Sequence, residues 1–178
     1  MVLTAFLLVT LGAADQSGWH NYMPQGSGVH FSMPGTVHMD TAPDPTGGAK
    51  MLNRYRSEFK GNVYTILIGD VSSEFQPVVS QLWEQDRKGP KVKKILDNAL
   101  KAQAAASGAK VRFNKFGDLK GFPILAQMQD NPDNSGTNTF AAFTKRGVVI
   151  ASAVTPKTED DVKEGMKFIG SVNLSDRS

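Results

Sequence analysis

The sequence contains no cysteine among its 178 residues. Disulfide bonds, thiol nucleophiles and zinc sites built from thiolates are therefore excluded, and a lipoprotein anchor, which requires a cysteine, is not expected. Hydrophobic residues make up 40% and charged residues 21% of the chain, which is an ordinary composition for one globular domain. We predict a single domain over residues 15–178.

Positive charge is absent from the start of the chain, where the first Lys or Arg is Lys50. Residues 2–14 are uncharged and largely apolar, a stretch too short to cross a bilayer but typical of the core of a secretion signal. Gly12 and Ala14 are the small residues that a signal peptidase requires. We predict a signal peptide over residues 1–14 and a periplasmic or secreted protein that is not an integral membrane protein. A signal peptide normally carries a Lys or Arg after the first Met, and this sequence has none there. The alternative is therefore that residues 2–14 form a buried apolar strand or helix.

Histidine is scarce, with three residues that all lie near the N-terminus: His20, His30 and His38. Their spacing is neither that of a strand nor that of a helix presenting two ligands to one ion. We predict His30 on the polar face of a strand, His20 and His38 in loops, and no metal site. The alternative is a periplasmic copper-binding protein, because four methionines accompany the histidines and thioether with imidazole suits Cu(I). These methionines are Met23, Met33, Met39 and Met51.

Motifs for other chemistry are missing or incomplete. Residues 130–136 resemble the first half of a calcium loop, but Ala142 occupies the position of the required glutamate, so we predict a hairpin turn. The GGAK stretch at residues 47–50 lacks the other residues of a phosphate loop. No Gly-x-Ser-x-Gly motif is present, and no acid is placed to orient a histidine. We predict a protein that is not an enzyme, with no catalytic residues and no cofactor; a hydrolase with two distant carboxylates is a second alternative.

Charge of one sign is concentrated between Glu84 and Lys120, where ten basic residues stand against four acidic ones, a local net charge of +6. Lys91, Lys94, Asn98 and Lys101 share one face of a predicted helix. We predict that such a face attracts a protein or an anionic partner in the cell envelope by long-range electrostatics. The alternative is a solvated helix face that serves solubility alone. The interleaved basic and aromatic residues of 110–116 are interpreted as a strand with an inner apolar face, so no nucleic-acid partner is expected.

Alternation of apolar and polar residues predicts strands at 29–33, 51–59 and 63–70, the last two joined by a turn at residues 60–62. Leu52, Arg54, Arg56 and Glu58 are predicted to share a half-exposed face. Residues 41–50 are rich in Pro, Gly and Asp and are predicted to be turn. Four further strands are predicted at 109–116, 122–129, 137–145 and 148–154, and their short connections indicate an antiparallel meander.

Three helices are predicted from apolar residues at helical spacing. The first begins near Ser73 with a capping box completed by Gln76, and Gly89-Pro90 ends it. The second covers residues 91–107 and stops at Gly108. The third follows Thr158 as its N-cap. The inward-facing residues are predicted to be Phe75, Val78, Val79, Leu82 and Trp83 in the first; Val92, Ile95, Leu96, Ala99 and Ala106 in the second; and Val162, Met166 and Ile169 in the third.

The order β-β-β-α-α-β-β-β-β-α predicts an α+β fold with three layers, α/β/α, around a mostly antiparallel sheet of about six or seven strands. Its details resemble a known family. An aromatic residue, Trp19, precedes a glycine-led strand that ends in Pro-Gly, residues 28–35. Gly121-Phe122-Pro123 opens the second strand of the meander, and the last helix ends in FIGSVNL, residues 168–174.

Residues 19–174 thus resemble the PsbP-like superfamily, which includes an extrinsic lumenal subunit of photosystem II, a Ran-binding import factor and bacterial envelope proteins of the DcrB type. The resemblance implies a secreted bacterial member with a three-layer fold that serves as a non-enzymatic accessory or binding protein. No functional residue can be carried over, because no motif here matches a binding motif of one member.

Overall fold

The computed structural model describes residues 18–44, 51–69, 71–156 and 158–176. The proposed signal peptide, residues 1–14, lies outside the described residues, as does the GGAK stretch. The described residues form ten strands and three helices. In chain order these are β1 (Trp19–Tyr22), β2 (Val29–Pro34), β3 (His38–Pro43), β4 (Met51–Phe59), β5 (Asn62–Ile68), α1 (Gln76–Asp86), α2 (Pro90–Ser107), β6 (Lys110–Leu119), β7 (Phe122–Asp130), β8 (Gly136–Thr144), β9 (Gly147–Thr155), α3 (Glu159–Ser171) and β10 (Asn173–Leu174).

Seven strands form one antiparallel sheet in the order β3-β4-β5-β9-β8-β7-β6. The meander predicted from the sequence is confirmed as β6 to β9, and the hairpin predicted at residues 60–62 is confirmed as the β4–β5 turn. Lys60 and Gly61 both have positive φ angles there, of 51° and 78°. The β6–β7 turn repeats this geometry at Lys120 and Gly121. Such two-residue turns match the twist of the strands they join and so fix their register.

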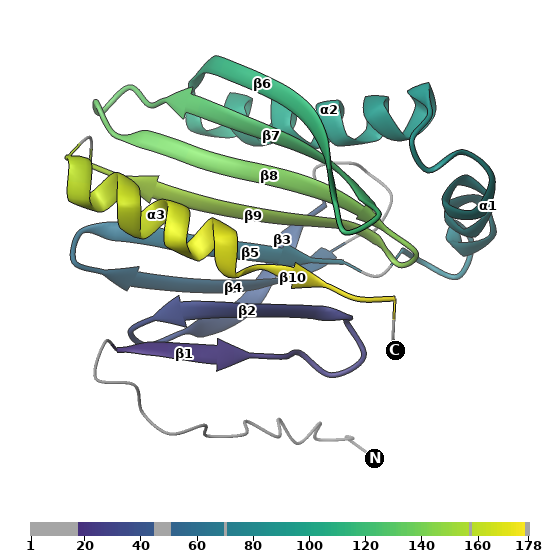
Figure 1. Cartoon of the computed structure of the whole chain (residues 1–178), viewed down its shortest axis with the longest axis horizontal. Coiled ribbons are helices and arrows are strands. Elements are labelled where there is room, and N and C mark those ends of the chain that lie inside the picture. Colours follow the sequence, from purple (N-terminus) through teal and green to yellow (C-terminus); the bar gives the residue numbers. More distant parts are fainter. Residues whose placement is uncertain (1–17, 45–50, 70, 157, 177–178) are drawn as a thin grey trace.

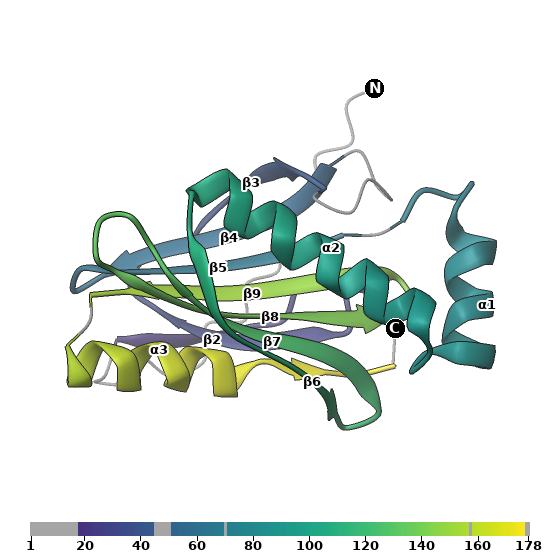
Figure 2. The same cartoon turned by 90° about the horizontal axis from the view of Figure 1, so that it is seen from above.

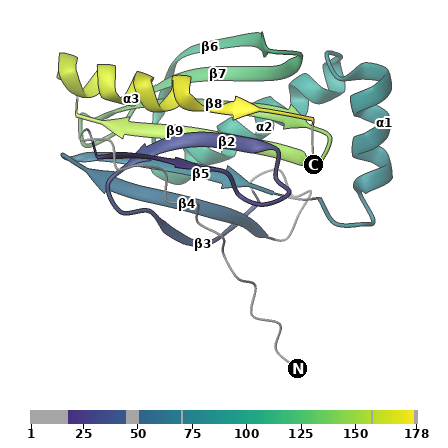
Figure 3. The same cartoon turned by 60° about the horizontal axis from the view of Figure 1, so that its bottom comes forward.

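The sheet is covered on both faces, which confirms the three-layer α+β architecture. Figure 1 shows α3 (yellow) across the near face of the sheet and α2 (teal) behind it, and Figure 2 shows the sheet between these two helices from above. The near face also carries a second sheet of three strands, in the order β1-β2-β10. Figure 3 shows β2 running beside β5, and β2 also contacts β4 and α3. Tyr64 of β5 joins these layers, because its ring lies 5.9 Å from that of Trp19 and 5.4 Å from that of Phe168 in α3.

Helix boundaries follow the sequence signals at α2 and α3. Helix α2 begins at Pro90 and ends before Gly108, whose φ of 65° is the left-handed conformation that favours glycine. The hydroxyl of Thr158 accepts a hydrogen bond from the Asp161 amide at 3.3 Å, so the predicted N-cap of α3 is confirmed.

The capping box predicted for α1 is wrong. Helix α1 begins at Gln76, and Phe75 precedes it without any side-chain cap. The carbonyl of Ser72 accepts hydrogen bonds from the amides of Phe75 and Gln76, so residues 72–75 form a turn ahead of the helix. The Gln76 side chain donates instead to the carbonyl of Lys145 at 3.0 Å, which ties α1 to the β8–β9 turn.

The structure differs from the predicted elements in several further places. Strands β1, β3 and β10 were not predicted, and β3 includes Thr41–Pro43 of a segment predicted to be turn. Leu52 is buried although Arg54 and Arg56 on the same face are not, because Leu52 packs beside Gly69 at the end of the sheet. Four residues predicted to face inward are exposed: Phe75 and Val78 at the first predicted helix, Ala106 in α2 and Met166 in α3. The buried faces of α2 and α3 are instead centred on Leu96 and Leu100, and on Gly165 and Phe168.

Candidate functional site

The basic segment of the sequence gathers around α2 and β6. Its residues lie on the end of α1, on α2 and on β6, and α2 contacts β6. The Lys93 ammonium lies 5.8 Å from the centre of the Phe116 ring, and Lys88 pairs with Asp118 at 2.8 Å. We define the basic surface as the exposed cationic residues of α2 and β6: Lys91, Lys93, Lys94, Lys101, Lys110, Arg112 and Lys115.

The cations of the basic surface differ in how far their charge is compensated. Lys101 pairs with Asp97 at 2.6 Å and Arg112 with Asp130 at 3.9 Å. Lys91, Lys94, Lys110 and Lys115 form no ion pair with any described residue. The shared exposed face predicted for Lys91, Lys94, Asn98 and Lys101 is therefore confirmed, but within it Lys91 and Lys94 carry the uncompensated charge.

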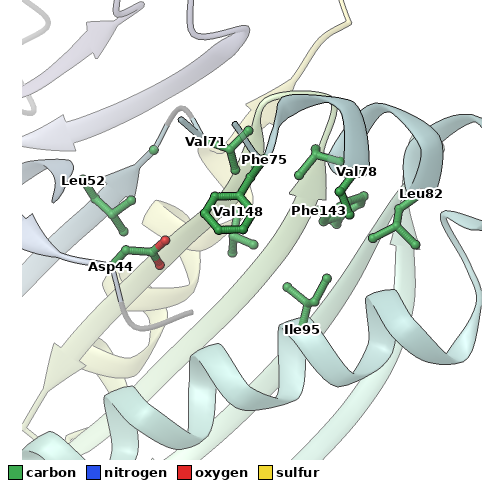
Figure 4. Close-up of a pocket in the computed structure, with 12 residues that line it drawn as sticks. Asp44, Leu52, Val71, Phe75, Val78, Leu82, Ile95, Phe143 and Val148 are labelled. Carbon is green, nitrogen blue, oxygen red and sulfur yellow. The ribbon is translucent and has the colours of Figure 1, made fainter. Parts of the chain in front are cut away.

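An apolar cavity of about 190 Å³ lies between α1, α2 and the ends of β4, β8 and β9 (Figure 4). Its wall includes Leu82 of α1, Ile95 of α2 and Phe143 of β8. Phe75 and Val78, at the start of α1, line it and remain 44% and 53% exposed. Asp44 is the single ionisable residue among those that line the cavity. The cavity can therefore accept a small apolar group, but its wall offers no pair of groups for acid-base or nucleophilic chemistry.

The chain is similar to known proteins in structure but not in sequence. No protein-family model matches the chain, and no curated protein matches it in sequence. The solution structure of cyanobacterial PsbP (CyanoP) from Synechocystis sp. PCC 6803 superposes on it with a TM-score of 0.54 and 12% identity, covering 94% of this chain and 99% of that one. The fold is PsbP-like. A protein of unknown function and putative regulator, PA94 from Pseudomonas aeruginosa, gives a TM-score of 0.40 at 14% identity, covering 90% of this chain and 98% of that one.

The three histidines of the PsbP-like domain lie on different strands. His20 is in β1, His30 in β2 and His38 in β3, so the loop positions predicted for His20 and His38 are wrong, whereas the exposed strand position of His30 is confirmed. No group of three or more His, Asp or Glu residues within the described ranges is placed to hold a metal ion. Of the four nearby methionines, Met33 is fully buried in the core, and Met23, Met39 and Met51 are at least half exposed.

The loop that resembles a calcium site is built as a turn. A carboxylate oxygen of Asp133 accepts hydrogen bonds from the amide of Ser135 at 2.9 Å and from its hydroxyl at 2.6 Å. The side-chain amide of Asn131 donates hydrogen bonds to the hydroxyls of Ser135 and Thr137. These polar groups thus bond to one another, as expected of a hairpin turn rich in Asn and Asp. The loop borders a shallow polar hollow of about 430 Å³ that also includes Gln103 and Gln129.

Ionisable groups with shifted pKa values lie outside both hollows. The guanidinium of Arg54 lowers the pKa of Asp40 by hydrogen bonding across β3 and β4. A hydrogen bond from Lys88, followed by one from the Gly121 amide, lowers the pKa of Asp118. Burial raises the pKa of the Tyr22, Tyr55 and Tyr64 phenols. Each shift is explained by an ion pair or by packing, and none marks a catalytic acid or base.

No helix in the described part of the chain is long and apolar enough to cross a membrane.

Proposed function

We propose that this PsbP-like domain is a non-catalytic accessory module that binds an acidic macromolecular partner through the basic surface. The observation that carries the proposal is the position of Lys91 and Lys94, which are exposed on α2 and unpaired within the described residues. They lie on the same helix as Lys93 and Lys101, so the fields of these cations add around α2. The PsbP-like fold is compatible with the same class of function.

The charge distribution favours a binding role over a purely solubilising one. A solubilising surface intersperses both signs of charge, and such mixing is seen on α3, where Lys163 pairs with Glu159 at 2.9 Å. The basic surface instead leaves five cations without an ionic partner among the described residues: Lys91, Lys93, Lys94, Lys110 and Lys115. Clustered charge of one sign raises the rate at which an oppositely charged partner is encountered and selects against partners of the same sign.

The proposal can be tested by charge reversal on α2. The double variant Lys91→Glu, Lys94→Glu and the wild-type domain are used to capture partners from an extract of the native cell envelope. Lys101 is left unchanged because Asp97 already compensates it. We expect the variant to lose partners that the wild type retains, and we expect wild-type capture to weaken with salt, since exposed charges are screened over about 8 Å at physiological ionic strength.

A matched control is the double variant Lys60→Glu, Lys163→Glu, which changes the net charge equally but lies on the β4–β5 turn and on α3. Both residues are exposed. Retention of the partners by this control, together with their loss from the α2 variant, supports the basic surface as the binding site. Capture of the same partners by all three proteins would contradict it.

We also propose that the protein is exported, with residues 1–14 as the signal peptide and the domain in the periplasm or outside the cell. The support is the uncharged apolar stretch that ends in small residues before Asp15. N-terminal sequencing of protein isolated from its native cells should begin near Asp15. Recovery of the intact protein from the cytoplasm, beginning at Met1, would refute export.

A further inference from the structure

Strand β6 is an open edge of the large sheet. It is the terminal strand in the sheet order, and it runs for 10 residues without a proline. Every residue from Lys110 to Asp118 is exposed. The opposite edge, β3, has 6 residues and ends in Pro43, which cannot donate a ladder hydrogen bond. The domain therefore has one blunted edge and one long edge that could accept another strand.

The register of the β6–β7 hairpin shows which backbone groups of β6 face away from the sheet. Leu119 and Phe122 flank a two-residue turn, so they form a hydrogen-bonded pair. Hydrogen-bonded and non-hydrogen-bonded pairs alternate along an antiparallel ladder. Asn114 and Phe116, whose partners are Gln127 and Leu125, therefore direct their N–H and C=O groups outward. These are the groups that an added strand would engage.

The side chains of β6 combine cations with large exposed apolar groups. Val111 and Phe113 are each 46% exposed, and Phe116 is 40% exposed. Large apolar side chains along an open edge offer contacts to a neighbouring strand. A bulge at Val111–Phe113 bends only the first part of β6, and the segment from Phe113 to Leu119 pairs regularly with β7.

Charge selects the occupant of this edge. Lys110, Arg112 and Lys115 lie on β6, and Lys93 reaches over Phe116 from α2. A second copy of β6 would bring the same cations into proximity, and like charges on facing strands are destabilising. A strand that alternates Glu or Asp with apolar residues would instead place its carboxylates beside Lys110 and Lys115 on one face of the sheet and its apolar side chains beside Phe116 on the other.

We infer that β6 binds an extended acidic peptide by adding it to the large sheet as a further antiparallel or parallel strand. This inference rests on the proposed function and deepens it, because it names the class of partner and the element that docks it. Backbone hydrogen bonds from the outward groups of Asn114 and Phe116 would supply affinity, and the cations would supply selectivity.

The test measures binding of two labelled decapeptides of equal charge to the intact domain by fluorescence anisotropy. One alternates Glu with Val and the other alternates Glu with Pro, which lacks the N–H groups that a ladder requires. We expect the Glu-Val peptide to bind at least about tenfold more tightly, a difference of about 1.4 kcal/mol. Equal binding of the two peptides, or no binding of the Glu-Val peptide, would overturn the inference.

A pair of variants at Asn114 isolates the backbone contribution. Asn114→Ala removes the side chain but keeps the outward N–H, whereas Asn114→Pro removes both. We expect about tenfold weaker Glu-Val binding for Asn114→Pro and a change of less than about twofold for Asn114→Ala. Thermal unfolding of both variants checks that Pro at this edge position leaves the fold intact; if it does not, the comparison of the two peptides on the wild-type domain decides the question.

The outcomes separate this inference from the proposed function. If charge reversal at Lys91 and Lys94 abolishes partner capture but Asn114→Pro binds the Glu-Val peptide like the wild type, the basic surface is used without strand addition. If neither change has an effect, both proposals fall. Self-association of the wild type that Asn114→Pro prevents would assign the edge to a second copy and overturn the acidic-peptide inference.

Discussion

Gly165 in α3 offers a sharp test of how closely this helix approaches the sheet. A Cβ atom at position 165 would lie 2.8 Å from Cγ2 of Thr155 and 3.4 Å from Cβ of Ala153. Thr155 is 1% exposed and β-branched, so its methyl group has little room to move away. Overpacking of this kind costs about 1–3 kcal/mol, and the gain in helix propensity on replacing Gly by Ala offsets about 1 kcal/mol. We expect Gly165→Ala to lower the free energy of unfolding by about 1 kcal/mol.

The same helix provides the matched control. An added Cβ at Gly170 would meet no atom within 4 Å, so Gly170→Ala should gain helix propensity without a clash and raise the free energy of unfolding by about 0.5 kcal/mol. Urea and thermal unfolding followed by circular dichroism measure both changes, and 1 kcal/mol corresponds to about 2–4 °C in Tm for a domain of this size. Stabilisation by both substitutions would mean that α3 does not pack against β9 as closely as described.

Phe168 is fully buried against Tyr64, whereas Met166 is 52% exposed. We therefore expect Phe168→Ala to lower the free energy of unfolding by about 3–5 kcal/mol. Met166→Ala should lower it by less than about 1 kcal/mol. Equal losses in denaturant unfolding would contradict the orientation of α3. The Asp118 carboxyl should titrate below its ordinary pKa, and Lys88→Ala should raise that pKa. A lowered folded-state pKa stabilises the protein above the unfolded-state pKa, and this contribution is lost as the pH falls through the folded value. An unchanged Asp118 pKa in an NMR titration of Lys88→Ala would refute the pairing.

Much of the architecture could be predicted because local signals decided it. Pro90 and Gly108 bound α2, Thr158 caps α3, and the turn at Lys60-Gly61 fixes the β4–β5 hairpin. Each of these residues acts through its own backbone or its near neighbours, so the sequence alone contains the information. The two-sided apolar pattern of the central strands likewise indicated that both faces of the sheet are covered.

The elements that escaped prediction depend on distant partners. Strand β10 has only 2 residues and exists because Asn173 and Leu174 pair with β2. The Pro, Gly and Asp content of residues 41–50 predicts turn, yet Thr41–Pro43 belong to β3, which pairs with β4 over six residues from His38 to Pro43. Tertiary pairing overrides local propensity in both cases. Met166 was misplaced because helical periodicity alone does not reveal that α3 rests on Gly165 and Phe168.

The candidate site was predictable in its charge but not in its geometry. The exposed face of Lys91, Lys94 and Lys101 follows from helical spacing. The ion pair between Lys101 and Asp97 was open to prediction from their spacing of four residues. The open edge of β6 could not be predicted, because its place in the sheet depends on β9 pairing with β5 at the other side of the meander.

The most direct test of binding at the basic surface is an NMR titration of the isotope-labelled domain with the Glu-Val decapeptide. We expect the largest changes in backbone amide shifts at Asn114 and Phe116 of β6 and around Lys91 and Lys94 of α2, with smaller changes as salt is added. Changes confined to residues outside the basic surface, such as Val78 at the apolar cavity or His30 on β2, would contradict the proposed binding site.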